Sequence, residues 1–384
     1  MNVAQRSEYF PEANHAGSSF LGRIAVVRLA IVGVLLMPIS GCFVVELLLG
    51  KQIVHISVSP SGGEIAYVQF PNLVIVKSLD NGDEDICKIR VPLMTEEVHF
   101  TSDGAMVAVD QPEFSVTSSE ASVERVVALY EVNTCELARE IPLQGLEDTT
   151  ALAFSSDGSF LLRSSEQSDA SHVQLDLMDG DTGNSIASWI YPNTHPISFA
   201  LSGDNTLALV GMAQHLSQTE EGEVSDEHIG KAVLIQVPTG EIVREWVENE
   251  NLGIRAVAIS ADGSTIAFKY YDGTLKTTHL PTGDTQTLQS TAQEFEAMLS
   301  TFDVFSRFEK LLLSPTGAYV YSHSLFDSER VLMHEVSSRE KVHEFVYEED
   351  LGDFEISPNG QTLVVGTEGG EIKVTDLIPI LERN

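Results

Sequence analysis

Seven short corners of the form Ser/Thr-x-x-Gly, each placed between two apolar runs, constrain this chain more than any other feature of its sequence. The corners are Ser59–Gly62, Thr101–Gly104, Ser155–Gly158, Ser202–Asn205, Ser260–Gly263, Ser314–Gly317 and Ser357–Gly360. Their spacing of about 42 to 58 residues suits a four-stranded blade with loop insertions and is too long for most helical repeat units. The sequence therefore predicts an all-β, seven-bladed β-propeller of four-stranded antiparallel blades.

The order of apolar and polar runs inside each repeat supports this prediction. In the fifth repeat, residues 254–260, 265–269 and 274–279 are expected as the inner, second and third strands, and a polar outer strand follows. Inner runs are almost continuously apolar or small, as in strands covered on both faces, whereas outer runs alternate. Blades packed radially around an axis produce this gradient, so we expect one propeller domain over residues 54–384.

Two kinds of turn resemble those of WD repeats. They are Asp272-Gly273-Thr274 and Gly369-Gly370-Glu371 before a third strand, and Pro238-Thr239-Gly240 and Pro281-Thr282-Gly283 after one. The resemblance spans about residues 54 to 377 and implies the fold without implying a function. The chain lacks the Trp-Asp and Gly-His dipeptides of that family, so we expect apolar packing, at about 25 cal/mol per Å², to replace the family's buried hydrogen-bond network.

The first 42 residues have the order of a bacterial secretory signal, with arginines, then an apolar run over 29–37, then small residues and a cysteine. Ile39-Ser40-Gly41-Cys42 resembles a lipobox, the motif at which lipoprotein signal peptidase cuts before a diacylglyceryl-modified cysteine. This resemblance implies a lipoprotein signal peptide over 1–41, cleavage between Gly41 and Cys42, and lipid on Cys42. It also implies a membrane-anchored lipoprotein of a bacterial cell envelope, facing the periplasm or the cell exterior.

A second interpretation of the same region stays open. Residues 29–50 also form one apolar stretch that would be an uncleaved transmembrane helix, although Pro38 and Glu46 count against it.

The last repeat has only three clear strands within residues 353–377, because the proline at 379 makes the tail a poor fourth strand. Residues 44–49 are apolar and precede the first corner at the distance expected of an outer strand. We therefore expect residues 42–53 to hold the lipidated cysteine and the outer strand of the last blade, which closes the ring. The alternative is that residues 43–52 are only a spacer.

Charge and cysteine content limit the partners. The formal net charge of −35 repels nucleic acids and anionic headgroups, so we expect no nucleic-acid binding, and we expect a protein or peptide partner that is basic where charge attracts it. Solubility or a saline habitat would also explain the acidity. Cys87 and Cys135, in an outer strand and a tight turn of neighbouring repeats, have no metal or redox spacing, and we expect two free thiols. The alternative is a disulfide, which requires that neighbouring blades bring the two residues unusually close.

Long insertions are expected between the second and third strands of four blades and between blades 5 and 6. They cover residues 111–122, 164–172, 212–230, 324–329 and 289–308. In a four-stranded meander these connections emerge on one face, which we take as the binding face, with unselected loop growth as the alternative.

Two of these insertions hold the candidate partner-binding residues. They are Glu220, Glu221, Glu223, Asp226 and Glu227 in the blade 4 loop, and Phe302 and Phe305 in an expected amphipathic helix after a capping box at 291–294. The acidic loop matches no known metal-binding spacing, so we expect a solvated loop and neither metal nor cofactor.

The chain has no nucleophile elbow and no phosphate-binding loop, so no catalytic residue is assigned. His55, Ser57 and His99 are expected on inner strands, where they would line the central channel. We therefore expect a non-enzymatic, lipid-anchored scaffold that binds a protein through the long-loop face. The alternatives are a propeller enzyme, lactonase-like or hydrolytic, with a site in the channel, and an assembly factor without a discrete pocket.

Overall fold

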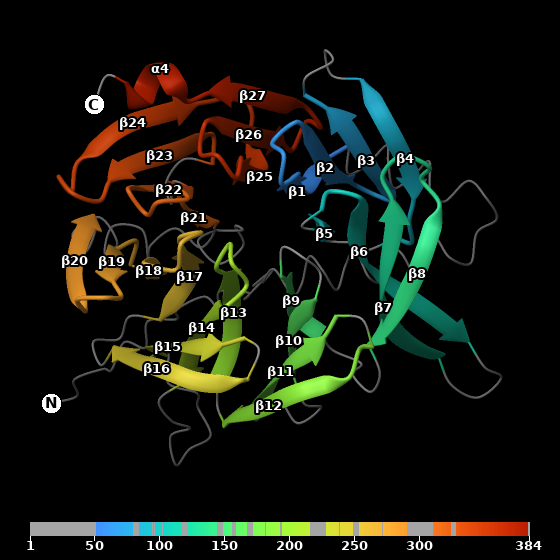
Figure 1. Ribbon diagram of the computed structural model, residues 1–384, viewed down its shortest axis with the longest axis horizontal. Coiled ribbons are helices and arrows are strands. Elements are labelled where there is room, and N and C mark those ends of the chain that lie inside the picture. The colour runs from blue at the N-terminus through green and yellow to red at the C-terminus, as the bar shows by residue number, and fades with distance from the viewer. Residues whose placement is uncertain are drawn as a thin grey trace, which may run out of the picture.

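The computed structural model describes residues 51–382, and it confirms the seven-bladed β-propeller (Figure 1). Not described within that range are residues 80–83, 94, 96, 102, 117–120, 144–148, 156–158, 167–171, 181, 193, 216–227, 238, 249–252, 271, 290–309 and 324–327. The expected N-terminal helix and signal, the lipidation site and strand 44–49 all lie outside the described residues.

The blades follow one another along the chain, and within each blade the strands run in sequence order from the axis to the rim. Blade 1 holds β1 (Ile53–Val58), β2 (Glu64–Gln69), β3 (Leu73–Ser78) and β4 (Asp85–Arg90), and blade 2 holds β5 (Val98–Phe100), β6 (Met106–Val116), β7 (Ala121–Glu131) and β8 (Leu137–Leu143). Blade 3 holds β9 (Thr149–Phe154), β10 (Phe160–Glu166), β11 (His172–Asp179) and β12 (Ser185–Pro192), and blade 4 holds β13 (Thr194–Leu201), β14 (Leu207–His215), β15 (His228–Gln236) and β16 (Glu241–Glu248). Blade 5 holds β17 (Ile254–Ile259), β18 (Thr265–Tyr270), β19 (Leu275–His279) and β20 (Asp284–Gln289), and blade 6 holds β21 (Leu311–Leu313), β22 (Tyr319–His323), β23 (Arg330–Glu335) and β24 (Lys341–Val346). Blade 7 shows β25 (Leu351–Ile356), β26 (Thr362–Thr367) and β27 (Ile372–Asp376), followed by the short helix α4 (Ile378–Leu381).

The repeated corner joins the inner strand to the second strand, and one hydrogen bond explains its sequence. In all seven corners the first hydroxyl accepts a hydrogen bond from the backbone N–H five residues later, at 2.8 to 3.1 Å. In the six blades where it is described, the fourth corner position takes a positive φ, which is +66° at Gly263. Asn205 has a φ of +58° at the same place in blade 4, because asparagine tolerates this conformation better than most residues.

Alternation of strand direction gives the disc two distinct faces. The corner face carries the seven corners and the turns from third to outer strands, and the loop face carries the turns from second to third strands and the connections between blades. Residues 111–116 and 121–122, expected as loop, are strand instead, because β6 and β7 continue as one long hairpin. Figure 1 shows this hairpin reaching beyond the rim of the disc.

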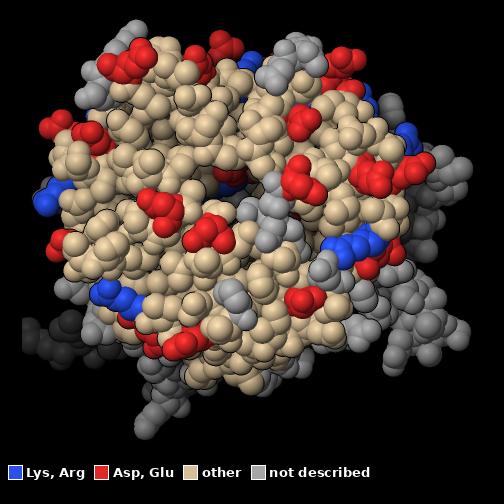
Figure 2. Space-filling view, in the orientation of Figure 1, with Lys and Arg blue, Asp and Glu red and all other residues tan. Residues whose placement is uncertain are grey.

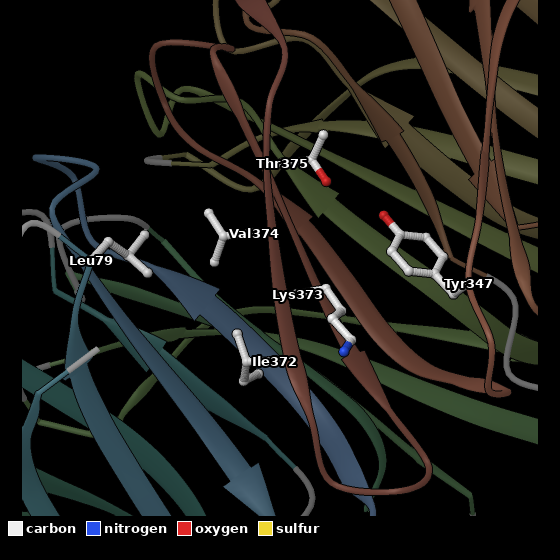
Figure 3. Close-up of a pocket in the computed structure, with 6 residues that line it drawn as sticks. All are labelled: Leu79, Tyr347, Ile372, Lys373, Val374 and Thr375. Carbon is white, nitrogen blue, oxygen red and sulfur yellow. The ribbon is translucent and has the colours of Figure 1, made fainter. Parts of the chain in front are cut away.

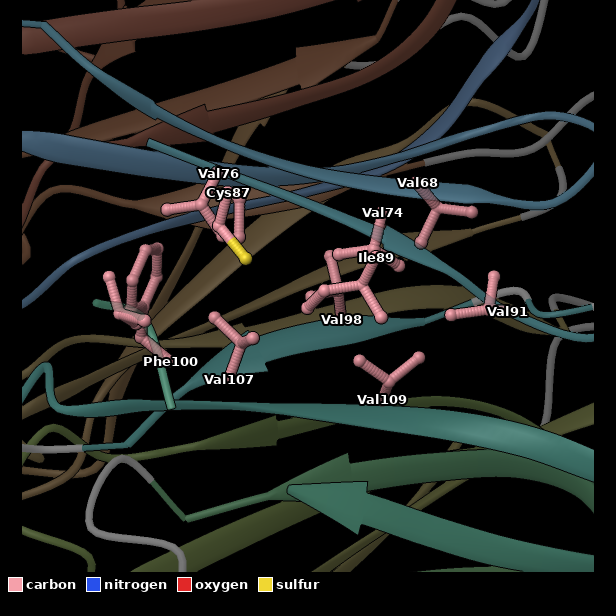
Figure 4. Packing of buried hydrophobic residues seen from close by; sticks show 12 residues of the cluster. Val68, Val74, Val76, Cys87, Ile89, Val91, Val98, Phe100, Val107 and Val109 are labelled. Atoms are coloured by element: carbon pink, nitrogen blue, oxygen red, sulfur yellow. The ribbon is translucent and has the colours of Figure 1, made fainter. Parts of the chain in front are cut away.

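Apolar packing between adjacent blades forms the core, as expected. Between blades 1 and 2 the buried set includes Val76, Cys87, Val107 and Val109, drawn in Figure 4. Comparable clusters fill the other blade interfaces. Blades 7 and 1 meet at their inner strands, where Asp353 Oδ2 accepts a hydrogen bond from the Ile56 N–H at 2.8 Å.

The expectation of two free thiols is wrong, because Cys87 and Cys135 form a disulfide with a Cα–Cα distance of 5.6 Å. Cys87 lies on β4 of blade 1 and is buried, and Cys135 lies in the β7–β8 turn of blade 2 with a φ of +61°. Radial packing lays the outer strand of one blade over this turn of the next, so residues 48 positions apart come into contact. The disulfide therefore links blades 1 and 2 covalently near the rim.

Among the described residues, no helix is long and apolar enough to cross a membrane.

Candidate functional site

Counting back from the first residue of each corner identifies equivalent residues on the inner strands, which border the central channel. The residues four positions before each corner are His55, Glu97, Ala151, Ser198, Ala256, Lys310 and Asp353. Those two positions before each corner are Ser57, His99, Ala153, Ala200, Ala258, Leu312 and Glu355. Because inner strands run from the loop face to the corners, the first set lies in the half of the channel nearer the loop face and the second set lies nearer the corner face.

The two sets divide the channel wall into unlike halves. Blades 3, 4 and 5 contribute only alanine and serine, whereas blades 6, 7, 1 and 2 contribute all of the ionisable groups in these sets. We call these six ionisable residues the polar arc: Lys310, Asp353, Glu355, His55, Glu97 and His99. Figure 2 shows a hollow at the centre of the disc with acidic and basic atoms in its depth.

One end of the polar arc is an ammonium group held between two carboxylates. Lys310 Nζ lies 3.0 Å from Asp353 Oδ1 and 2.9 Å from Glu355 Oε2. Burial acts to lower the pKa of Lys310, but the two carboxylates outweigh it and raise that pKa, so the lysine stays charged. Burial, with the nearby charge of Glu355, raises the pKa of Asp353 although Lys310 opposes the shift. The Asp353 carboxylate also binds the Ile56 N–H, so it joins blade 7 to blade 1.

The other end is a pair of imidazoles beside a glutamate. The rings of His55 and His99 meet edge to face with centroids 4.9 Å apart, and the His99 ring packs on Phe154 at 5.1 Å. His99 Nε2 lies 3.5 Å from Glu97 Oε2. Burial lowers the pKa of His55 well below its usual value, and the charges of His99 and Lys310 lower it further. His55 is therefore a neutral imidazole at neutral pH.

A buried ion pair stands behind Glu97. Asp110 on β6 is almost fully buried and pairs with Arg125 of β7, with one contact from Oδ1 to Nε at 3.1 Å. Burial raises the pKa of Asp110, and Arg125 opposes this shift. The Asp110 N–H donates to the Glu97 carbonyl, so the pair fixes the start of the inner strand that carries Glu97 and His99.

The polar arc has the chemistry of a site for cationic groups. It sets three carboxylates against one ammonium, with His55 neutral. Ser57, expected beside the histidines, has a structural role instead, because its Oγ accepts the Phe100 N–H at 3.2 Å and links blades 1 and 2. Ser198 makes the equivalent bond to Val257 between blades 4 and 5. In the part of the chain that is described, no three His, Cys, Asp or Glu side chains are grouped to hold a metal ion.

The structure brings together His55 and His99 of the residues considered from sequence. The candidate partner-binding residues in the blade 4 loop and in the segment between blades 5 and 6 lie outside the described residues, as do Gly41 and Cys42. Sequence reasoning did not find Lys310, Asp353 and Glu355 as members of the site. The signal was present, because aligning the seven corners and reading back four and two residues selects all of them.

No protein-family model matches the chain, and no curated protein matches it by sequence.

Proposed function

We propose that this protein is a lipid-anchored propeller of the bacterial cell envelope that binds a basic protein or peptide segment at its loop face and catalyses no reaction. The polar arc carries the proposal, because it places three carboxylates against one ammonium on the channel wall, with Asp353 and Glu97 in the half nearer the loop face. A guanidinium or ammonium group entering there would meet acceptors that are already oriented by the inner strands.

Three other observations support the proposal. The net charge of −35 attracts basic partners over long range and speeds their association at low salt. The disulfide between Cys87 and Cys135 fits an oxidising compartment such as the periplasm or cell exterior, where such bonds persist. The lipobox-like sequence ending at Cys42 supports membrane anchoring through a lipid on that cysteine.

Binding is tested with a fluorescent arginine-rich peptide and two matched double variants. Glu97→Gln with Glu355→Gln removes two negative charges from the polar arc, and Glu136→Gln with Glu241→Gln removes two from exposed rim positions. We expect the first to weaken binding about tenfold and the second less than about twofold. Equal weakening by both would mean nonspecific attraction to an acidic surface and would refute the site.

The contribution of the long loops is tested on envelope extract. Replacing residues 216–227 by Asn-Gly joins β14 to β15 through a two-residue turn and leaves the paired strands intact. We expect partners captured by the full chain to be lost with this variant, and unchanged capture would exclude the blade 4 loop.

Anchoring is tested by labelling cells with a fatty acid. Label on the chain that disappears in Cys42→Ala is the expected result. Membrane association that persists in that variant would favour the transmembrane helix instead.

A second candidate function rests on the imidazole pair. His55 is neutral and adjoins His99, which itself contacts Glu97, so the channel holds a base beside an acidic group. If the protein is a lactonase or another hydrolase, turnover of lactone or ester substrates should fall at least about a hundredfold in His55→Gln and His99→Gln. Absence of turnover in the unaltered protein across such substrates would remove this candidate.

A further inference from the structure

One position on the third strands behaves differently in blade 7. Seven residues after the first residue of each corner, the second strand pairs with one residue of the third strand. In six blades that third-strand residue is at most 2% exposed; the six are Val76, Leu129, Leu177, Leu234, Thr277 and Met333. The equivalent residue of blade 7 is Val374 on β27, and it is 46% exposed. In the six other blades an outer strand lies directly beside this position, whereas β27 is the outermost described strand of its sheet.

A groove runs along this edge. It has a volume of about 490 Å³ and is lined by Ile372, Lys373, Val374 and Thr375 of β27, with Leu79 from blade 1 on one side and Tyr347 from blade 6 on the other (Figure 3). A strand added here would cover apolar side chains on both of its flanks. An uncovered edge of this kind also invites pairing with other chains.

We propose that residues 44–49 of this chain fill the groove as the outer strand of blade 7, antiparallel to β27, so that Cys42 and its lipid emerge on the corner face. The N-terminal segment that the structure does not describe ends beside this groove, immediately before Lys51. Lys51, the first described residue, packs so closely on the turn before β27 that a Cβ at Gly370 would collide with its backbone. Residues 44–49 are the six that end two positions before it.

We take the register of this strand from blades 1 and 6. In blades 1 and 6 the outer-strand residues opposite Val76 and Met333 are Cys87 and His343, and each stands 14 residues before the next corner. The corresponding spacings in blades 2, 3 and 4 are 16, 15 and 16 residues. Fourteen residues before Ser59 is Val45. Val45 is therefore placed opposite Val374, at the Cα separation of about 4.5–5.5 Å of directly paired antiparallel residues.

The same register assigns each side chain a face, and the assignment agrees with its chemistry. Leu47 takes the place of the buried residues Ile89 and Phe345, so it faces the groove. Glu46 takes the place of Lys88 and Glu344, which are charged residues of the outer strands β4 and β24. Leu48 takes the place of Arg90 and Val346, both of which are exposed. The only charge of the segment thus falls on the outward face.

This placement orients the molecule on a membrane, a consequence that rests on the proposed lipid at Cys42. An outer strand runs from the corner face to the loop face, so Val44 lies at the corner face and Cys42 two residues beyond it. A lipid on Cys42 holds the rim of the corner face against the bilayer. The loop face, with the half of the channel that holds Asp353 and Glu97, then points away from the membrane, where a partner can reach it.

Strand placement is tested by cross-linking the full chain, which needs no lipid. Val45→Cys with Val374→Cys should form a bond within one chain on mild oxidation, seen as a linked peptide by mass spectrometry. Val45→Cys with Val346→Cys, on the exposed face of β24, is the matched control and should not cross-link. Absence of the first bond in folded protein, or a bond between two chains, would overturn the proposal.

The face assignment is tested by one substitution at two adjacent positions. Leu47→Asp places a charge in the groove and should lower the melting temperature by more than about 4 °C, whereas Leu48→Asp should lower it by less than about 1 °C. Equal effects of the two variants would contradict the register.

Orientation is tested on the mature lipoprotein in phosphatidylcholine vesicles that contain a nitroxide headgroup. A fluorophore at Pro358→Cys, on the corner face of blade 7, should be quenched at least about twofold more than one at Glu348→Cys, on the loop face. The reverse would overturn the orientation. Loss of anchoring without loss of the Val45–Val374 cross-link would refute the proposed lipid and leave the strand placement standing.

Discussion

At the scale of single residues, the corner hydroxyls hold the first turn of every blade. Ser260 is fully buried, and its Oγ accepts the Thr265 N–H at 3.0 Å and donates to Asp262 at 2.6 Å. Ser260→Ala leaves that buried N–H without its acceptor, so we expect the free energy of unfolding to fall by about 1–3 kcal/mol in urea denaturation. Ser338→Ala, on an exposed turn, is the control and should change it by less than about 0.5 kcal/mol. Equal losses would show that the hydroxyl bond contributes nothing specific.

A second residue couples stability to pH. Burial, with smaller contributions from Lys341 and Lys269, lowers the pKa of His334 to about 4. In the unfolded chain a histidine titrates near 6.5, so His334 stabilises the fold fully above about pH 6.5, and this contribution is lost as the pH falls to about 4. We expect His334→Gln to flatten the decline of stability between these two values, measured by melting temperature against pH. The exposed His279→Gln should leave the slope unchanged, and an unchanged slope in His334→Gln would contradict the assignment.

At the scale of elements, the disulfide is the feature with the largest expected effect on stability. It closes a loop between residues 48 positions apart, which corresponds to about 2–4 kcal/mol from restriction of the unfolded chain. Cys87→Ser with Cys135→Ser should lower the free energy of unfolding by that amount. In the unaltered protein, unfolded without reductant, we expect neither cysteine to react with a thiol reagent. Reaction of both would show that the bond is absent.

Strand positions were predictable because apolar alternation and the corners are local signals. Residues 254–260 and 265–269 were expected as the first two strands of blade 5, and the structure places β17 and β18 there. Contacts between elements were not predictable in the same way. The pairing of Cys87 with Cys135 depends on how one blade overlaps the next, and nothing in the sequence near either cysteine records that overlap.

The expected loop at residues 111–122 was wrong for a related reason. Residues 111–122 contain a proline and polar side chains and have no corner, so they were expected as an insertion. In the structure the residues on both sides of 117–120 pair with each other as one long hairpin, up to Val116 with Ala121. Pairing of a hairpin with itself needs no second apolar face, which is why polarity was a poor guide there.

At the scale of the whole molecule, the polar arc exists only because the ring closes. Lys310 and Asp353 come from the last two blades and His55 and His99 from the first two, so the chain must return to its beginning before they share one wall. Counting back four and two residues from each corner finds the members of the polar arc if the repeats are taken to form a ring, but no single repeat contains all of them. The contact of blade 7 with blade 1 is therefore the premise of the proposed site, and the placement of residues 44–49 is the premise of the proposed orientation.

Hydrogen–deuterium exchange of β27 in the full-length protein tests the placement of residues 44–49 as the ring-closing outer strand most directly. Among the described strands β27 pairs only with β26, so alternate N–H groups along its outer edge need a further strand to be protected. If residues 44–49 form that strand, the amides of Ile372–Asp376 should exchange as slowly as those of β23, which is paired on both sides. Rapid exchange of alternate β27 amides, with β23 still protected, would contradict the account.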